Sequence, residues 1–233
     1  MRISVAIPAY NEEEYIGACL ESLEKQSCPN FEVVVCLTCT DRTEEIVAGF
    51  ARRGILDLKV IHEPKKGIAL ARQRAFEHTS GEIIASADAD TEYPPWWIER
   101  IREDFMTNPQ IVAVCGPVRH REAKGLARLY LSQFYPLIDA LAREASERLG
   151  LVNVIGSNFA VKRKAFERVG GFDTSLSAFE DNELAKRLKS EGEILYDPIM
   201  VAYPSARRYN GLGVFRVPLW NIKNYIEVVL LSI

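Results

Sequence analysis

The stretch Glu82-Ile83-Ile84-Ala85-Ser86-Ala87-Asp88-Ala89-Asp90 begins as an apolar run and ends in two carboxylates. An apolar run of this length between turn residues is typical of a buried strand in an α/β sheet. Ligands of such sheets bind beyond the carboxyl ends of the strands, where Asp88 and Asp90 would lie. Side chains two residues apart on an extended chain point to one side, so both carboxylates could face one ligand.

Two hard oxygen donors at this place favour Mg²⁺ or Mn²⁺ held together with the phosphates of a substrate. A solvated turn after the strand is the alternative interpretation, because Asp-x-Asp on its own is a common pattern. The choice between the two depends on the motifs in the rest of the chain.

Segments on both sides of this stretch alternate between strand and helix patterns. Strands are expected over residues 3–8, 31–37 and 58–61, with helices over 15–23, around 46–50 and over 68–78. This alternation predicts an α/β fold with a parallel, doubly wound sheet. The second half is less regular, with helices expected near 97–105, 125–149 and 180–190 and strands near 111–118, 154–161 and 194–203.

Length and composition bound the class of protein. The chain has 233 residues, which is enough for one large domain or two small ones, and a net charge of −3, which is too small to indicate nucleic acid as a partner. The first residues enter a strand pattern directly, so no signal peptide is expected. Five scattered cysteines favour reduced thiols and a cytoplasmic protein over a disulfide framework.

Five motifs, in order along the chain, resemble those of the family 2 glycosyltransferases, which have the GT-A fold. They are residues 4–13 (SVAIPAYNEE), 67–72 (GIALAR), 88–90 (DAD), 170–173 (GGFD) and 179–188 (FEDNELAKRL). Each motif is weak alone, and their order and spacing carry the resemblance. The resemblance implies a Rossmann-like, mostly parallel sheet flanked by helices in one domain over 1–205. Residues 1–118 would form its nucleotide-binding half and 119–205 a less regular acceptor half, with a basic and aromatic helical extension over 206–233.

The resemblance also implies an activity, the metal-dependent inverting transfer of a sugar from a nucleotide-diphosphate sugar. The acceptor would be a saccharide hydroxyl or a polyprenyl phosphate. In this family the second Asp of the motif is generally the metal ligand, here Asp90, and the first contacts the ribose or a metal-bound water, here Asp88. Mg²⁺ or Mn²⁺ would act there as a Lewis acid on the leaving nucleoside diphosphate.

Other positions match residues that bind the nucleotide donor in the family. They are Pro8, Ala9, Tyr10, Glu12, Asp41 and Arg72. The sequence departs from the family after the second strand, where Cys36-Leu37-Thr38-Cys39 replaces the usual Asp-Asp-Gly-Ser. Neither Cys nor Leu accepts a strong hydrogen bond from a base imide, so the donor base is not predicted.

Asp181 matches the family's catalytic base, and Glu180 beside it would lie at the acceptor. An inverting transfer needs a base that takes the proton of the acceptor hydroxyl. The alternative interpretation is that these are first-turn carboxylates stabilised by the helix dipole. Arg207 and Arg208 are candidate ligands of an acceptor phosphate or of the diphosphate, because a guanidinium grips phosphate with two parallel hydrogen bonds.

Residues 200–224 contain no acidic residue and lead into the apolar run 225–233. A C-terminal helix packed on the sheet with its basic side in water explains this pattern. An interfacial element whose basic side chains meet anionic head groups explains it as well. The run is too short to span a bilayer, so the second interpretation predicts peripheral contact, on the cytoplasmic face of a membrane.

Two other functions are compatible with parts of the pattern. A sugar-phosphate nucleotidyltransferase would share a Rossmann-like half and a metal carboxylate, but no early Gly-rich loop with a following Arg and Lys is present to bind a triphosphate. A degenerate module that binds a nucleotide sugar without turnover would explain the replaced base-contact residues. Turnover of a donor separates this module from the enzyme.

Overall fold

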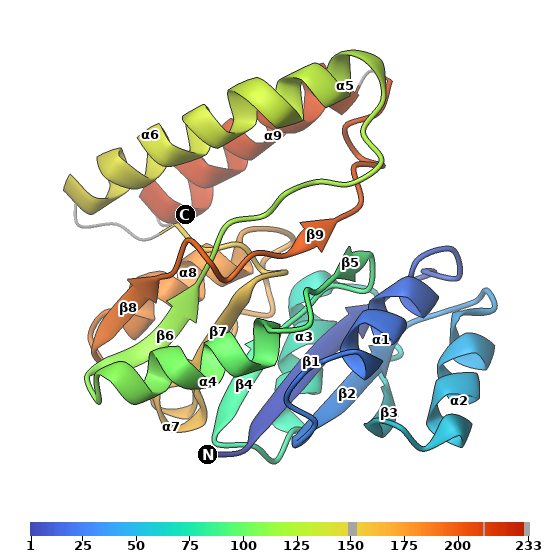
Figure 1. Ribbon diagram of the computed structural model, residues 1–233. Coiled ribbons are helices and arrows are strands. Elements are labelled where there is room, and N and C mark those ends of the chain that lie inside the picture. The colour runs from blue at the N-terminus through green and yellow to red at the C-terminus, as the bar shows by residue number, and fades with distance from the viewer. Residues whose placement is uncertain (149–152, 212, 231–233) are drawn as a thin grey trace.

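A computed structural model describes residues 1–148, 153–211 and 213–230. Within these residues the chain forms a seven-stranded sheet flanked by helices, a small two-stranded sheet, and a pair of helices that lies to one side (Figure 1). Leu149 and residues 231–233, which fall in segments discussed above, lie outside the described residues.

The first half of the chain alternates strictly between strands and helices. Its elements are β1 (Ile3–Ala9), α1 (Ile16–Glu24), β2 (Phe31–Leu37), α2 (Thr43–Arg53), β3 (Asp57–His62), α3 (Ile68–Glu77) and β4 (Ile83–Ser86). The four strands are parallel in the order β3-β2-β1-β4. Every residue of β1 and β2 is buried, as expected for strands covered by helices on both faces. The predicted doubly wound half is confirmed.

The second half completes the sheet with mixed strand directions. It contains α4 (Trp97–Thr107), β6 (Ile111–Cys115), β7 (Phe159–Lys162), α7 (Arg163–Arg168), α8 (Glu180–Leu188) and β8 (Glu193–Tyr196). The strand β7 runs antiparallel to both neighbours, β4 and β6, while β6 and β8 are parallel. The sheet is therefore mostly parallel, as predicted.

The strand predicted over 154–161 begins only at Phe159, so that prediction was wrong in its first five residues. A tight turn causes this, because the amide of Asn158 donates to the carbonyl of Ile155 at 2.8 Å. The side chain of Asn158 is used inside the protein, where its Oδ1 accepts from the indole of Trp97 at 2.9 Å. Residues 154–158 thus form a loop beside the end of β4.

The extended conformation predicted through Asp90 was also wrong beyond Ser86, where β4 ends. The chain turns instead, and the amide of Thr91 donates to the carbonyl of Asp88 at 3.1 Å. The next strand, β5 (Thr91–Glu92), pairs antiparallel with β9 (Tyr203–Pro204). This pairing brings the chain after β9 to the end of β4.

Two apolar clusters fill the two faces of the large sheet. The helices α1, α2 and α4 cover one cluster, and α3, α7 and α8 cover the other (Figure 1). In the second cluster the ring of Phe76 lies 4.9 Å from those of Phe166 and Phe172. Both cores lie next to the carboxyl ends of the parallel strands. The polar residues at those ends are therefore supported by tightly packed apolar side chains.

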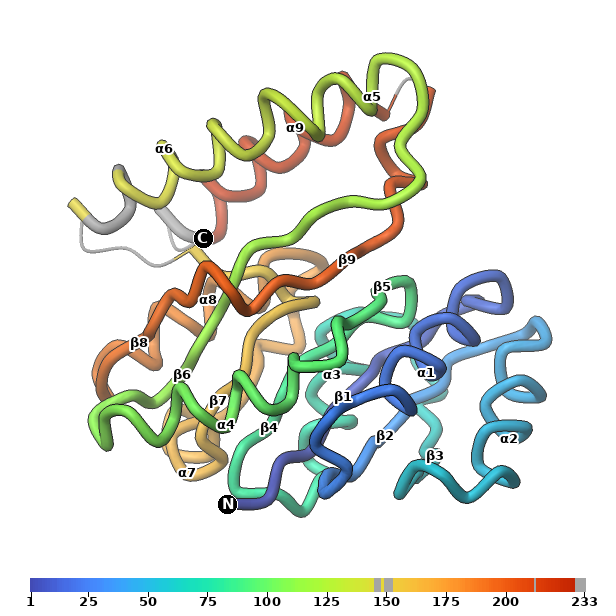
Figure 2. The backbone as a smooth tube through the Cα atoms, viewed as in Figure 1, coloured from blue at the N-terminus to red at the C-terminus, as the bar shows by residue number. Residues whose placement is uncertain are grey.

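The remaining helices form a pair beside the sheet. Continuous helical backbone runs through α5 (Gly125–Leu129), the π-helical turn η1 (Tyr130–Phe134) and α6 (Tyr135–Arg148), next to α9 (Gly213–Tyr225) and η2 (Ile226–Leu230) (Figure 2). The π-helical turn lies just before Pro136, which has no amide proton for a regular helical bond. A third small cluster joins the pair, including Leu131, Tyr209 and Val214. In the described part of the chain, no helix combines the length and apolar character needed to cross a bilayer.

Candidate active site

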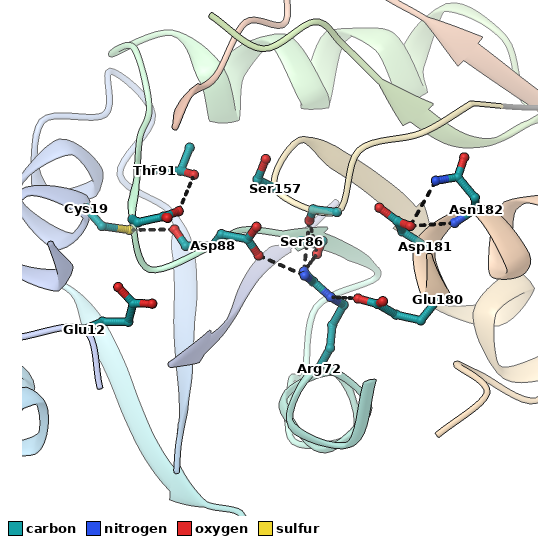
Figure 3. Close-up of polar contacts among 12 residues, drawn as sticks. Glu12, Cys19, Arg72, Ser86, Asp88, Thr91, Ser157, Glu180, Asp181 and Asn182 are labelled. Atoms are coloured by element: carbon teal, nitrogen blue, oxygen red, sulfur yellow. Dashed lines mark hydrogen bonds and ion pairs between the residues drawn. The ribbon is translucent and has the colours of Figure 1, made fainter. Parts of the chain in front are cut away.

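Arg72 lies at the centre of a buried polar network at the carboxyl edge of the sheet. It rises from α3 between two carboxylates, with Nη2 2.9 Å from Asp88 Oδ1 and Nε 3.1 Å from Glu180 Oε1 (Figure 3). Its Nη1 donates to Ser86 Oγ at 2.5 Å and to the carbonyl of Gly156 at 2.9 Å. One guanidinium therefore connects the end of β4, the loop before β7 and the first turn of α8.

The charge of Arg72 is maintained although its side chain is only 2 % exposed. Burial acts to lower its pKa, but Asp88, Glu180 and Asp181 raise it above the ordinary value, so the side chain stays a cation. A buried charge requires such partners, because an unpaired one is very costly. Arg72 uses its hydrogen bonds in this structure for groups of the protein itself. Contact between Arg72 and the sugar donor stays a prediction.

Asp181 lies in the first turn of α8, next to Glu180. Its Oδ1 accepts from the amide of Asn182 at 2.8 Å and from Asn182 Nδ2 at 3.0 Å. Burial, and then the charge of Glu180, raise the pKa of Asp181 to about 7. A carboxyl that titrates near neutral pH has the property that a general base needs.

Gly156 lies against both Asp181 and Arg72. A Cβ at this position would lie 2.9 Å from Arg72 Nη2 and 3.1 Å from Asp181 Oδ2. The missing side chain thus leaves room at the loop for both the Asp181 carboxylate and the guanidinium. Any larger residue here would displace one of the two groups.

Asp90 belongs to a second ionic group, on the other side of Asp88. Arg207 Nη2 lies 3.0 Å from Asp90 Oδ2 and 2.5 Å from Glu12 Oε1, and its guanidinium carbon is 4.5 Å from the centre of the Tyr15 ring. Glu12 Oε2 is buried and has no hydrogen-bond partner. Burial raises the pKa values of Glu12 and Asp90, and Arg207 partly offsets this. Arg208 is exposed beside this group, where its charge also lowers both pKa values.

The carboxylates fit a cation that is shared with a phosphate ligand. Asp88 and Asp90 each use one oxygen for an arginine, and both supply the hard oxygens that Mg²⁺ and Mn²⁺ prefer. Among the described residues, no group of three His, Cys, Asp or Glu side chains is placed to hold a metal ion. The protein would therefore contribute one or two ligands, as is common for Mg²⁺ bound with substrate phosphates.

The predicted nucleoside loop follows β1 at the same edge. Pro8 and Ala9 are the last residues of that strand, and Ala9 is buried. Tyr10 is exposed, and Lys66 Nζ lies 4.1 Å from the centre of its ring. An exposed aromatic ring with a lysine over it is available to a base or a phosphate, and nucleotide contact by this loop stays a prediction.

Asp41 lies near this loop, but its carboxylate is engaged within the protein. Oδ1 accepts from the amide and hydroxyl of Thr43, at 3.1 and 2.6 Å, and Oδ2 accepts from the amide of Glu13 at 3.2 Å. These bonds join the loops that follow β1 and β2. The contact of Asp41 with the donor stays a prediction.

Sequence reasoning assigned no role to three residues that build this site: Ser86, Gly156 and Tyr93. The Tyr93 hydroxyl accepts from the amide of Asp88 at 3.1 Å and donates to the carbonyl of Ser157 at 2.9 Å. This orients the turn that carries Asp88. A serine inside the apolar run of β4 was the available signal for Ser86, whereas Gly156 and Tyr93 carry no local signal.

Comparison with known proteins identifies the class of this site. Among curated relatives, the glucosyl-dolichyl phosphate glucuronosyltransferase of Haloferax volcanii is 30% identical over 180 residues, which is 75% of this chain and 57% of that protein. The poly-beta-1,6-N-acetyl-D-glucosamine synthase of Staphylococcus epidermidis is 29% identical over 84% of this chain and 48% of its own length. This chain thus spans about half the length of these relatives.

Solved structures agree with the fold. The mannosyltransferase PcManGT from Pyrobaculum calidifontis, in complex with GDP-Man and Mn²⁺, matches with a TM-score of 0.72 and 26% identity over 88% of this chain and 57% of that one. Residues 1–349 of S. aureus TarS match with a TM-score of 0.68 and 21% identity over 89% and 61%. Fold and site together define a glycosyltransferase with the GT-A fold. The family model described as Glycosyl transferase family 2 matches residues 4–170, and the chain belongs to that family.

Proposed function

We propose that this chain catalyses metal-dependent, inverting transfer of a sugar from a nucleotide-diphosphate sugar to an acceptor. The observation that carries the proposal is the pairing of Arg72 with both Asp88 and Glu180. The Arg72 guanidinium holds Asp88, which lies beside the proposed metal site, at a fixed position relative to the first turn of α8. Asp181 lies in that turn. Donor and base must keep such a fixed separation for in-line attack on the anomeric carbon.

Asp90, assisted by Asp88, would hold Mg²⁺ or Mn²⁺. The cation, when bound, would neutralise charge on the leaving nucleoside diphosphate. The related mannosyltransferase with GDP-Man and Mn²⁺ supports this part of the proposal. The loop with Tyr10 and Lys66 would bind the nucleoside end, and Glu12 would position Arg207 beside the diphosphate.

Asp181 would take the proton of an acceptor hydroxyl. Its Oδ1 is held by Asn182, and its Oδ2 lies against Gly156, which has no side chain. A pKa of about 7 keeps a large fraction of this carboxyl ionised at neutral pH and still basic enough to accept a proton.

The acceptor would be a saccharide hydroxyl or a lipid-linked phosphate. The name of the Haloferax volcanii relative, which includes a dolichyl phosphate, supports the second choice. A phosphate acceptor is already ionised and would not require Asp181, while Arg208 is exposed and able to bind it. A lipid-linked acceptor would bring residues 206–233 into peripheral contact with a membrane.

Release of nucleoside diphosphate from a panel of GDP- and UDP-sugars, with Mg²⁺ or Mn²⁺, tests this function. We expect turnover with at least one donor, and a loss of about 10² in transfer to a hydroxyl in Asp181→Asn, which keeps the shape but removes the base. Asp173→Asn, an exposed carboxyl on the loop before α8, is the matched control. Donor-dependent thermal stabilisation without any release would favour the binding module and contradict the enzyme.

A further inference from the structure

The long helix through η1 and α6 presents its apolar side to solvent. Four large apolar side chains with spacing i, i+3, i+4, i+7 are each at least half exposed: Phe134, Leu137, Ile138 and Leu141. A helix that covers a core buries such a stripe instead.

The side of this helix that faces the protein carries charged as well as apolar residues. Asp139 and Arg143 form an ion pair at 3.0 Å, and both are partly buried. The Arg143 guanidinium carbon lies 3.9 Å from the centre of the Tyr196 ring, at the end of β8. Asp139 and Arg143 thus lie on the inward side together with Leu131 and Tyr135, while the four-residue apolar stripe lies outward. An outward apolar stripe is unfavourable in water, because its apolar surface stays hydrated.

The neighbouring helix also exposes an apolar stripe. Its exposed stripe has spacing i, i+4, i+7, i+11 and consists of Phe215, Leu219, Ile222 and Ile226. Asn221 and Asn224 are partly buried on its other side, with Val214 buried among the residues that join the pair. The two stripes together are called the helix-pair face.

Exposed apolar side chains are concentrated on this pair. Eleven of the eighteen large apolar side chains that are exposed in the described part of the chain lie between residues 126 and 141 or between 215 and 226. Single exposed apolar residues are ordinary, but a concentrated patch marks an interaction surface. Figures 1 and 2 show both helices on the side of the molecule away from the large sheet.

Basic and aromatic side chains border the stripe of α9. Arg216 and Lys223 are exposed, and on a helix with 3.6 residues per turn both project about 80–100° from Phe215. Trp220 is exposed further round on the same side. Residues 200–224 contain no acidic residue, and Lys223 Nζ lies 3.7 Å from Oε1 of Glu227, one turn further on. An apolar stripe flanked by cations and an indole is the pattern of a helix that lies in the interface of an anionic membrane.

We propose that the helix-pair face docks on an anionic lipid surface. Its apolar side chains enter the boundary between head groups and acyl chains, and Arg216 and Lys223 meet lipid phosphates. The inference rests on the proposed function in one respect, because it defines the surface that would make the peripheral membrane contact expected there. It goes further by assigning much of that surface to the helix over 125–148, far from the C-terminal segment in sequence.

A second copy of the chain fits this face less well. An isologous dimer uses the same patch on both partners, so it would gather Arg216 and Lys223 of both copies in one interface. Like charges opposed in this way are destabilising, whereas anionic head groups complement them. Lipid is therefore the occupant that agrees with both the apolar stripes and their charge.

Docking on lipid would also place the candidate site near the membrane. The chain passes from β9 through Arg207, which contacts Asp90, and enters α9 at Gly213. Only a few residues thus separate the proposed lipid surface from the carboxylate edge. A lipid-linked phosphate would reach the site without leaving the interface.

Flotation with vesicles of phosphatidylcholine, with and without phosphatidylglycerol, tests the proposal at low and high salt. The wild-type chain is expected to float with anionic vesicles and to dissociate in part at high salt. Leu137→Glu combined with Leu141→Glu should reduce partitioning by at least about tenfold. Ile55→Glu with Met106→Glu is the matched control, because these side chains are as exposed but lie elsewhere. It should float like the wild type.

Arg216→Ser with Lys223→Ser gives a second measurement that does not depend on the folding of the α6 variant. It should weaken binding to anionic vesicles and remove the salt dependence. Binding is measured without donor, and inactive Asp181→Asn should float like wild type, so failure of catalysis and failure of docking are distinguishable. The proposal is overturned if the wild type binds no vesicles, if the α6 variant floats normally, or if that variant only converts a dimer to a monomer.

Discussion

Arg207 binds Asp90, with Nη2 of the arginine 3.0 Å from Oδ2 of the carboxylate, and the same nitrogen also reaches Glu12. The second carboxylate of the Asp-x-Asp motif is thus paired with a cation from the far end of the chain. A metal ion that uses Asp90 has to compete with this guanidinium or share the carboxylate with it.

Removing this competitor should strengthen metal binding. In Arg207→Ala, the half-saturating concentration of Mn²⁺ for thermal stabilisation should fall, because Asp90 and Glu12 lose their cation. The free energy of unfolding without metal should fall by about 1–3 kcal/mol, since two largely buried carboxylates lose a partner. Arg52→Ala, an exposed arginine on α2, is the control. Equal metal midpoints in the two variants would show that Arg207 does not compete at Asp90.

Asp90→Asn should abolish metal-dependent stabilisation by the donor and reduce transfer by at least about 10², because the amide is a poor ligand for a hard cation. The fold should change little, as Arg207 keeps its bond to Glu12. We expect the melting temperature to stay within about 4 °C of wild type. Asp57→Asn, an exposed partner of Arg2, serves as control. Undiminished transfer in Asp90→Asn would remove Asp90 from the metal site.

Arg72 should be needed both for the fold and for catalysis. Arg72→Ala leaves Asp88 and Glu180 without their shared cation and should lower the free energy of unfolding by about 3–5 kcal/mol. Arg72→Lys keeps the charge, but one ammonium cannot reach all four acceptors. It should fold and lose mainly kcat. The comparison is Arg74→Lys, a more exposed position on the same helix. A lysine variant with normal kcat would limit Arg72 to a structural role.

The pH dependence of transfer should report Asp181. Its pKa is raised to about 7, so the carboxyl is largely protonated at pH 5 and inactive as a base. Accordingly, kcat/KM for a hydroxyl acceptor should rise with pH through about 7 and level off above it.

Glu180→Gln should move this rise to lower pH, because the negative charge of Glu180 is one cause of the raised pKa of Asp181. Glu183→Gln lies in the same turn but its carboxylate is paired with Arg187, so it should leave the profile unchanged. Profiles measured over pH 5–9 with a soluble acceptor check both variants. A rise that Glu180→Gln does not shift would argue that another group titrates.

Several elements could be predicted from the sequence because their signals are local. The strands β1, β2 and β4 are mostly apolar, each with one polar residue, and α1 and α2 each show one apolar face. The sequence also marked Asp88, Asp90 and Asp181 as candidates, through the motifs around them. These signals can be recognised without knowing the tertiary contacts of the elements.

Other features carried no such signal. The strand β7 lies antiparallel between β4 and β6, and the chain turns after Ser86 into β5, which pairs with β9. The apolar stripe from Phe134 to Leu141 has the period of a core helix, yet it faces outward. Periodicity shows that a helix has two different sides, but not which side meets the protein.

The sequence by itself determined the order of strands and helices, the family resemblance and the carboxylates at the end of β4 and the start of α8. Only the tertiary structure decided how the charges are paired. Arg72 meets Glu180 across 108 residues of chain, and Arg207 meets Glu12 across 195. Such pairs form because a buried charge must find an opposite charge in space, and closeness in space at these separations depends on the whole fold.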